Sequence, residues 1–126
     1  MLRTGVDLIE VARVQQAVER YGERFLSRVF LESEWKPKQG RFPELAARFA
    51  AKEAVSKALG TGIGDVLWTD IEIVQDERGM PGVRLREVMR WRTDAMTVAI
   101  SVFPCAGTVC VASIFIRPAF RTSTVL

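Results

Sequence analysis

Apolar positions recur at helical spacing through the first half of the chain. Val11, Val14, Val18 and Tyr21 follow one another at steps of three and four residues, which predicts an amphipathic helix over 10–21. Segment 25–30 supplies further apolar anchors, and residues 31–35 favour a short helical turn. Segment 36–42 contains two lysines, a proline and a glycine, so we expect a mobile loop there.

A second helix forms the centre of the chain and includes the stretch RFAAKEAVSKALGTGIG at 48–64. Leu45, Phe49 and Ala50 give it an apolar stripe, and alanine is the best helix former. Gly60 stands where a residue in the left-handed conformation would end the helix. Glu53 lies in line with the apolar stripe, four residues after Phe49, and a carboxylate at that position needs an explanation.

Two interpretations of Glu53 stay open from the residues alone. Lys57 follows it by one turn on the same face, so the two side chains could form an ordinary ion pair at the rim of the core. Alternatively, Glu53 is a metal ligand, and the neighbouring cations Arg48, Lys52 and Lys57 bind phosphates.

Several other segments predict strands, and from Trp68 onward the apolar spacing changes to a period of two. Leu2–Ile9 is one, with Gly5 marking a close backbone approach, and Asp7 within it is either a turn or cap residue or a functional carboxylate. Residues 70–74 and 81–85 predict a hairpin, and 95–102 and 108–116 predict two further strands. Segment 84–92 is expected to form a short helix. Helices early and antiparallel strands late predict an α+β domain.

Composition narrows the chemistry. The chain has 126 residues, which suits a single domain over 1–118 with a C-terminal tail at 119–126. It contains no histidine, which excludes Ser-His-Asp and Cys-His nucleophile systems and HExxH zinc sites. Its two cysteines, Cys105 and Cys110, form no disulfide framework. With no long apolar run and no leader-like start, we expect a soluble cytoplasmic protein without a membrane partner.

The net charge of +3 is concentrated in the first sixty residues, which hold 11 Lys and Arg against 8 Asp and Glu. No basic run interleaved with aromatic residues occurs, so we do not expect nucleic acid as a partner. Arg13 and Arg20 share a face of the first helix away from its valines, and Arg24 extends this line if Gly22 only kinks the helix. The arginines are either an ordinary solvated face or a docking surface for an acidic helix.

Four segments carry a resemblance to a known family. They are GVDLIEVARV at 5–14, ERFLSRVF at 23–30, RFAAKEAVSKALGTGIG at 48–64 and DIEIVQDERGMPGVRL at 70–85. Together they closely resemble the holo-acyl-carrier-protein synthases, the small bacterial 4′-phosphopantetheinyl transferases. The resemblance implies an α+β fold, a homotrimer with coenzyme A between subunits, and Mg²⁺-dependent transfer of phosphopantetheine from coenzyme A to a serine of acyl carrier protein for fatty-acid synthesis.

The resemblance also assigns roles to residues. Asp7 and Glu53 match the Mg²⁺ ligands, and Lys57 matches a lysine that contacts the phosphates and stabilises the leaving group. The positions that match the coenzyme A cleft are Arg48, Lys52, Ser56, Lys57 and Gly62. Arg13, Arg20 and Arg24 fall where the family presents a basic surface to the acidic carrier protein. The group that accepts the serine proton stays open.

One segment departs from the family pattern. Ser101-Val102-Phe103-Pro104 aligns with a segment that contributes to the coenzyme A site of the adjoining subunit, and Phe103 and Pro104 replace its hydroxyl and imidazole. We therefore expect weaker binding of the nucleotide end of coenzyme A. The departure also leaves an alternative function, a non-catalytic relative that binds acyl carrier protein or coenzyme A.

Overall fold

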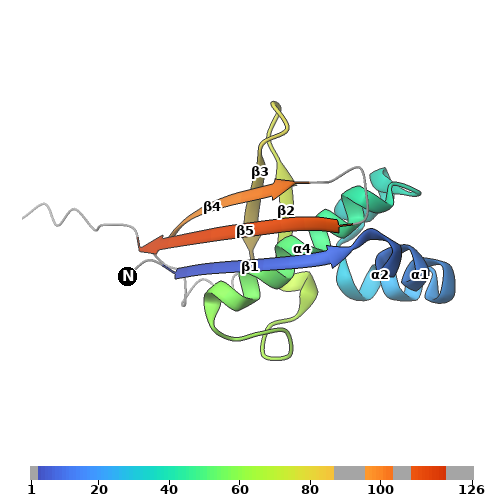
Figure 1. Ribbon diagram of the computed structural model, residues 1–126, viewed down its shortest axis with the longest axis horizontal. Helices are drawn as coiled ribbons and strands as arrows, with labels where there is room; N and C mark the ends of the chain where they lie inside the picture. The colour runs from blue at the N-terminus through green and yellow to red at the C-terminus, as the bar shows by residue number, and fades with distance from the viewer. Residues whose placement is uncertain (1–2, 87–95, 104–108, 119–126) are drawn as a thin grey trace, which may run out of the picture.

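The computed structural model describes residues 3–86, 96–103 and 109–118. Its longest helix, α4, lies against a three-stranded antiparallel sheet of order β1-β5-β4, and a separate hairpin, β2-β3, crosses the direction of that sheet (Figure 1). Helices α1 and α2 gather at one end of α4 (Figure 1). The described elements are β1 (Arg3–Glu10), α1 (Val11–Tyr21), α2 (Glu23–Val29), α3 (Glu32–Trp35), η1 (Lys36–Lys38), α4 (Phe42–Leu59), η2 (Trp68–Asp70), β2 (Ile71–Gln75), β3 (Pro81–Leu85), β4 (Met96–Phe103) and β5 (Val109–Pro118).

Helix α4 is buried on most of its circumference, and its sequence explains how. Six buried alanines let neighbouring elements approach its backbone closely: Ala46, Ala47, Ala50, Ala51, Ala54 and Ala58. Proline stands in its first turn, where no intrahelical N–H bond is lost. The helix ends at Gly60, whose φ of 75° is the left-handed conformation expected from the sequence.

Strand β1 approaches α4 closely at Gly5. A Cβ atom added at Gly5 would overlap the carbonyl oxygen of Ala54 and come within 2.9 Å of the backbone nitrogen of Ala58. Only glycine fits this contact, which confirms the close approach predicted from the sequence. Gly5, Asp7 and Ile9 lie on the less exposed side of β1, whereas Val6 and Leu8 point outward. The strand alternation therefore turns Asp7 to the less exposed side of β1.

The described core has two apolar clusters, one at each end of α4. The first joins the C-terminal half of α4 to the hairpin through Val55, Leu59, Val66, Ile71 and Ile73. The second joins the start of α4 to α1, α2 and α3, and includes Val14, Leu26, Phe30, Trp35 and Leu45. Apolar burial thus fixes the position of α4 at both of its ends.

Most predicted elements are confirmed, including the strand that contains Asp7, the hairpin and the α+β class. Gly22, however, does more than kink a helix: with φ 56° and ψ −135° it ends α1 and precedes α2. Arg24 therefore lies on a helix of its own. Part of the segment expected to be a loop, Lys36–Lys38, is a short 3₁₀ helix, and α4 already begins at Phe42.

Some expectations concern residues outside the described ranges. These are the helix expected over 84–92 beyond residue 86, the substitution at Pro104, and the tail at 119–126. Residues 84 and 85 belong to β3, so a helix does not begin at 84. Among the described residues, none of the helices is long and apolar enough to span a bilayer.

Candidate functional site

Asp7 and Lys57 meet where β1 crosses the last turns of α4. Asp7 lies in the middle of β1, opposite Ala112 of β5, and its side chain is only 15% exposed. Lys57 Nζ lies 2.7 Å from Asp7 Oδ1, and it also donates a longer hydrogen bond of 3.4 Å to the carbonyl oxygen of Val6. The hydrogen bond to Asp7 is the main cause that raises the pKa of Lys57. Asp7 and Lys57, two candidate site residues that are fifty positions apart in the sequence, are thus direct neighbours.

Glu53 lies on the same side of α4, one turn before Lys57. The ion-pair partner of Lys57 is Asp7, so the simple Glu53–Lys57 rim pair is not what the structure contains. Partial burial raises the pKa of Glu53, the negative charge of Asp7 raises it further, and Lys57 opposes both effects. The carboxylates of Asp7 and Glu53 are therefore close enough to repel one another, with a lysine beside both.

This donor set fits a hard divalent cation. Two carboxylates that destabilise each other's charge gain from a cation between them, and Mg²⁺ is commonly held by one or two carboxylates together with waters and substrate phosphates. No group of three or more Asp, Glu, Cys or His side chains suited to a metal occurs in the described part of the chain. A metal at this site would therefore rest on the two carboxylates.

Lys52 and Ser56, expected in the cofactor cleft, lie in the core instead. Both are fully buried. Lys52 Nζ is 2.6 Å from Glu34 Oε2, and it donates to the carbonyl oxygens of Val29 at 2.8 Å and Trp68 at 3.0 Å. Its three donors are used and no surface is left for a phosphate. The Ser56 hydroxyl donates to the carbonyl oxygen of Glu53 at 2.8 Å. In the single chain, burial therefore leaves neither side chain exposed, and the place of these two residues in the cofactor cleft stays a prediction.

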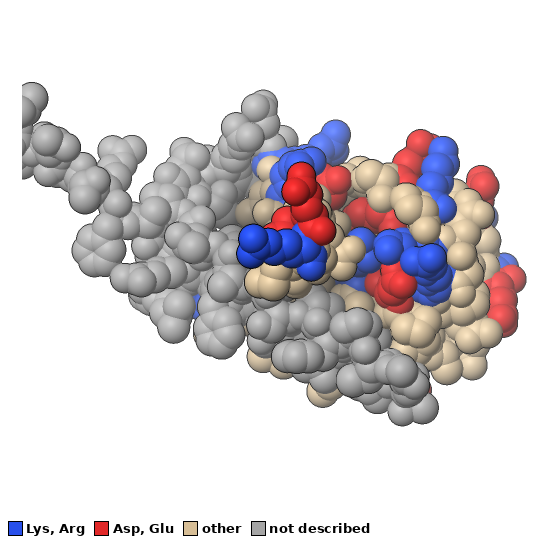
Figure 2. Space-filling view, turned by 90° about the horizontal axis from the view of Figure 1, so that it is seen from above, with Lys and Arg blue, Asp and Glu red and all other residues tan. Residues whose placement is uncertain are grey.

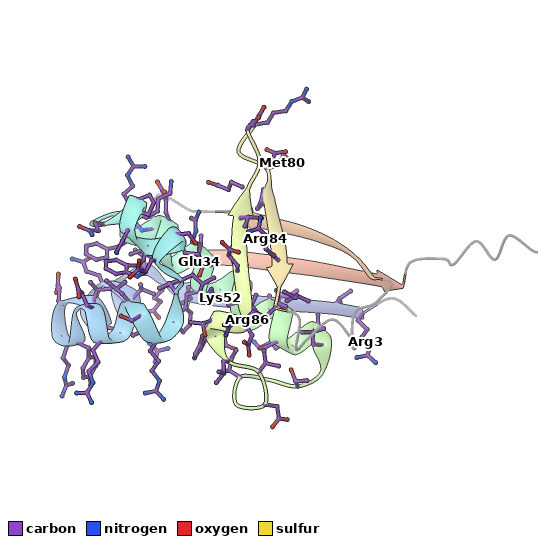
Figure 3. All side chains as sticks on the ribbon, turned by 180° about the vertical axis from the view of Figure 1, so that it is seen from behind. Arg3, Glu34, Lys52, Met80, Arg84 and Arg86 are labelled. Carbon is purple, nitrogen blue, oxygen red and sulfur yellow. The ribbon has the colours of Figure 1, made fainter. Side chains whose placement is uncertain are left out.

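Glu34 is the partner that the sequence analysis missed. Its carboxylate also accepts the N–H groups of Leu31 and Ile73, each at 2.8 Å, so α3, α4 and β2 are joined at one buried ion pair (Figure 3). Desolvation lowers the pKa of Lys52, while the charge of Glu34 raises it in part. The sequence did indicate that Lys52 would be buried. It is seven residues from both Leu45 and Leu59, which places it on an apolar face of α4.

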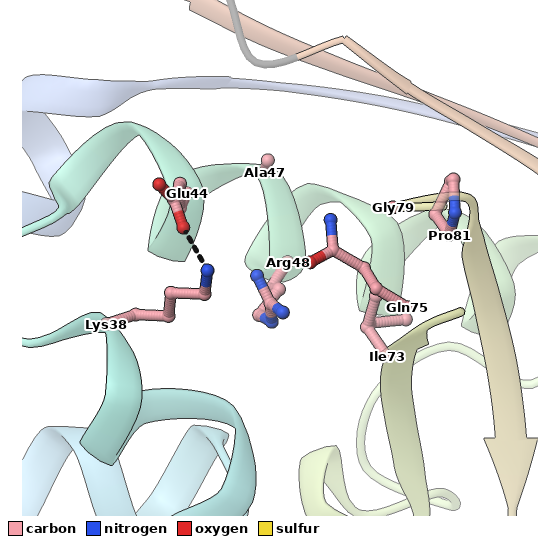
Figure 4. A pocket seen from close by; sticks show the side chains of 8 residues that line it. All are labelled: Lys38, Glu44, Ala47, Arg48, Ile73, Gln75, Gly79 and Pro81. Carbon is pink, nitrogen blue, oxygen red and sulfur yellow. Dashed lines mark ion pairs between the residues drawn. The ribbon is translucent and has the colours of Figure 1, made fainter. Parts of the chain in front are cut away.

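Arg48 lines a different feature, a cavity of about 340 Å³ between η1, α4 and the hairpin. Figure 4 shows the Arg48 guanidinium between Lys38 on one side and Ile73 and Gln75 on the other. Among the described residues, its Nε is buried without a hydrogen-bond partner. Lys38 Nζ is instead 2.7 Å from Glu44 Oε2. The cavity, which we call the Arg48 pocket, therefore contains two cations and one carboxylate. Its lining residues are Lys38, Glu44, Ala47, Arg48, Ile73, Gln75, Gly79 and Pro81.

Gly62 lies in the turn after α4. Its φ of 67° is a left-handed conformation that favours glycine, and its N–H donates to the carbonyl oxygen of Ser56 at 3.3 Å. The turn thus folds back over the last turn of α4. The N–H of Gly62 is used within the chain.

The three arginines proposed for docking are all exposed. Arg13 and Arg20 lie on α1 and Arg24 on α2, and none of them forms an ion pair with a described residue. Figure 3 shows nitrogen-tipped side chains that extend from α1 and α2 away from the rest of the molecule. This surface differs from the upper face of the molecule, where positive and negative side chains lie side by side (Figure 2). All three guanidinium groups are thus at the surface, and that of Arg20 lies 5.3 Å from the centre of the Tyr21 ring.

Comparison with known sequences gives a consistent result. Residues 3–102 match the sequence model of the 4′-phosphopantetheinyl transferase superfamily. A holo-[acyl-carrier-protein] synthase of Herpetosiphon aurantiacus is 44% identical over 105 residues, which cover 78% of this chain and 83% of that protein. A protein of the same name from Chlamydia trachomatis is 43% identical over 106 residues, which cover 81% of this chain and 88% of the relative.

Solved structures agree. The holo-[acyl-carrier-protein] synthase of Helicobacter pylori, in complex with coenzyme A, matches with a TM-score of 0.83 and 29% identity, covering 90% of this chain and 99% of that one. The Bacillus anthracis enzyme in complex with CoA (3′,5′-ADP) matches with a TM-score of 0.77 and 32% identity, covering 93% and 96%. The family resemblance of the sequence motifs is thereby confirmed: this chain belongs to the 4′-phosphopantetheinyl transferase superfamily.

Proposed function

We propose that this chain transfers the 4′-phosphopantetheine arm of coenzyme A to a serine of apo-acyl carrier protein, releases adenosine 3′,5′-bisphosphate, and serves fatty-acid biosynthesis. The observation that carries the proposal is the ion pair of Asp7 and Lys57 at the crossing of β1 and α4, with Glu53 one turn before Lys57 on the same helix. It is supported by relatives named holo-[acyl-carrier-protein] synthase and by the relatives whose structures contain coenzyme A.

Asp7 and Glu53 would hold Mg²⁺, which when bound would neutralise the diphosphate of coenzyme A and make its phosphorus more electrophilic. The chain itself contributes Lys57. Its side chain is 51% exposed, so it can exchange its contact with Asp7 for a phosphate oxygen when coenzyme A arrives. An ammonium there stabilises the charge that develops on the leaving diphosphate oxygen during transfer.

Two other expected residues keep a role in binding coenzyme A. Arg48 offers a guanidinium nitrogen, Nε, that has no hydrogen-bond partner in the described part of the chain and lies in the Arg48 pocket, which suits a phosphate. Gly62 keeps the turn after α4 narrow, so that a ligand can lie against its backbone. Lys52 and Ser56 contribute by packing α4 and not by contact with the ligand.

We further propose that the protein assembles as a homotrimer, with each coenzyme A site completed by a neighbouring subunit. In the single chain, two large apolar side chains on the outer face of β1 are exposed: Val6 at 54% and Leu8 at 62%. Burial of such a strand face between subunits is favourable, and closed symmetric assembly is the usual way to achieve it. Sedimentation equilibrium would test the assembly, and a monomer at the working concentration would contradict it.

Transfer is tested directly by mass. Incubation of the purified chain with apo-acyl carrier protein, coenzyme A and Mg²⁺ should convert the carrier to its phosphopantetheinylated form, detected by intact-protein mass spectrometry. Asp7→Asn and Lys57→Met should each lower the rate at least tenfold, whereas the exposed Asp65→Asn should not. A carrier that stays unmodified while it binds to the chain would favour the alternative function, a non-catalytic binding protein.

We propose that Arg13, Arg20 and Arg24 dock the acidic carrier protein. Their exposure and their lack of described ion-pair partners support this role. The double variant Arg13→Glu, Arg20→Glu should raise the KM for carrier protein and leave the affinity for coenzyme A unchanged. Arg78→Glu, an exposed charge in the hairpin turn, is the matched control. Equal losses for carrier protein and coenzyme A would contradict a docking surface.

A further inference from the structure

The Arg48 pocket contains a carboxylate, that of Glu44, whose negative charge would repel a phosphate. Glu44 projects from the first turn of α4 into a group of cations: Lys38 at 2.7 Å, Arg41 at 3.5 Å, and Arg48 one turn further along the helix. Figure 4 shows the side chains of Lys38 and Glu44 joined by an ion pair, with the Arg48 guanidinium beside them. The negative charge of Glu44 thus lies where a negative ligand would otherwise meet these cations.

The ion pair is partly shielded from water. The side chain of Lys38 is 21% exposed and that of Glu44 35%, so their attraction is less screened than that of a fully exposed pair. The hydrogen bond from Lys38 is the first cause that lowers the pKa of Glu44, so Glu44 is ionised at neutral pH. Arg48 shares the pocket but, among the described residues, its buried Nε has no partner. The pocket therefore has one cation, Lys38, engaged by Glu44, and a second cation, Arg48, whose Nε has no hydrogen-bond partner among the described residues.

We propose that Glu44 is an internal competitor that occupies Lys38 in the pocket and weakens the binding of a phosphate of coenzyme A there. The inference rests on the proposed function, since it requires coenzyme A as the ligand. An incoming phosphate must either break the Lys38–Glu44 pair or bind beside the carboxylate, and both reduce its affinity. Glu44 then sets how strongly this enzyme retains coenzyme A and its phosphate-bearing product.

The test is direct titration of coenzyme A into the intact protein by calorimetry. Glu44→Gln frees Lys38 and should tighten binding about two- to fivefold at low salt, the range expected for loss of one partly exposed ion pair. The gain should shrink as the salt concentration rises. Glu32→Gln is the matched control, because Glu32 pairs with Lys36 at 2.9 Å on the open surface, outside the pocket. It makes the same change in charge and should leave the affinity unchanged.

Two further arms identify the cation and the phosphate. In the double variant Lys38→Met, Glu44→Gln, the gain should disappear, because the freed Lys38 causes it. Titration of dephospho-coenzyme A, which lacks the ribose phosphate, shows which phosphate enters the pocket. If Glu44→Gln no longer tightens binding of this ligand, the ribose phosphate lies in the pocket; if it still does, the diphosphate lies there. Both outcomes support the proposal. A melting curve of each variant separates these effects from a loss of helix stability, which would not tighten binding.

Three results would overturn the inference while the proposed function stands: wild-type protein binds coenzyme A and modifies the carrier, but Glu44→Gln binds no more tightly; Glu32→Gln tightens binding equally; or the double variant keeps the gain. Wild-type protein that neither binds coenzyme A nor modifies the carrier would instead refute the proposed function, and this inference with it.

Discussion

The buried ion pair between Lys52 and Glu34 gives the sharpest prediction about stability. Both side chains are shielded from water, with exposures of 0% and 1%. Lys52→Met removes the cation but keeps the length of the side chain. It leaves the Glu34 carboxylate buried with two N–H donors and no counter-charge, and it leaves the carbonyl oxygens of Val29 and Trp68 without their ammonium donor.

The magnitude follows from these losses. Removing one partner of a buried pair costs about 3–5 kcal/mol, because a buried charge is left uncompensated. A domain of this size has a total unfolding free energy of about 5–15 kcal/mol, so Lys52→Met should remove a large share of it. Glu34→Gln should cost a similar amount, since it leaves the ammonium of Lys52 buried without a counter-charge.

The double variant separates the pair from the packing around it. In Glu34→Gln, Lys52→Met no buried charge remains, and the amide oxygen introduced by Glu34→Gln can still accept a backbone N–H. The double variant should therefore be more stable than the sum of the single losses predicts, with a coupling energy above about 1 kcal/mol. Urea unfolding followed by circular dichroism measures all four proteins of the cycle.

Lys36→Met is the control for Lys52→Met, because Lys36 pairs with Glu32 on the surface with side-chain exposures of 53% and 76%. Loss of an exposed pair should change stability by less than about 1 kcal/mol. If Lys52→Met is no more harmful than Lys36→Met, or if the two core changes are additive, the buried pair does not hold these elements together.

Three other predictions concern the strand contact, the pocket and the metal. Gly5→Ala should destabilise the fold by about 1–3 kcal/mol and slow transfer, because its Cβ would overlap the Ala54 carbonyl oxygen, whereas the exposed Thr4→Ala should do neither; thermal melts and the mass assay decide. Because Lys38 lowers the pKa of Glu44 from its ordinary value of 4.5, the carboxyl resonance of Glu44 in an NMR titration should have its midpoint below pH 4.5. The stability that the Lys38–Glu44 ion pair adds should be complete above pH 4.5 and should be lost as the pH falls through the pKa of Glu44 in the folded protein. A midpoint at pH 4.5 would show that this ion pair does not form. Addition of Mg²⁺ should raise the melting temperature of the wild type, and Asp7→Asn should abolish this shift; an equal rise in both proteins would place the cation elsewhere.

The central helix shows how much of the fold local sequence encodes. Its alanines, its apolar spacing and the terminal Gly60 are all local signals, and each corresponds to an observed feature of α4. The period-two segments likewise correspond to β2, β3, β4 and β5. Gly5 predicted a close approach because only a missing side chain permits one, although the sequence did not say which element would approach.

The partners of charged residues were decided by the tertiary structure. Helical spacing placed Lys57 beside Glu53 and Lys52 beside Arg48, but Lys57 pairs with Asp7 and Lys52 with Glu34. Spacing along one helix defines which side chains share a face, whereas burial depends on the elements that later pack against that face. The same limit explains the position of Arg24, because the backbone angles at Gly22 set the direction of a second helix.

The sequence by itself determined the α+β class, the boundaries of most elements and, through its motifs, the two carboxylates and the lysine of the candidate site. Only the tertiary structure decided that Lys52 and Ser56 are core residues, that Glu34 completes a buried ion pair, and that Glu44 shares a pocket with Arg48. The physical reason is the distance along the chain between the residues that interact. Periodicity reports the conformation of neighbouring residues, but desolvation and charge pairing depend on which distant segments the folded chain brings together.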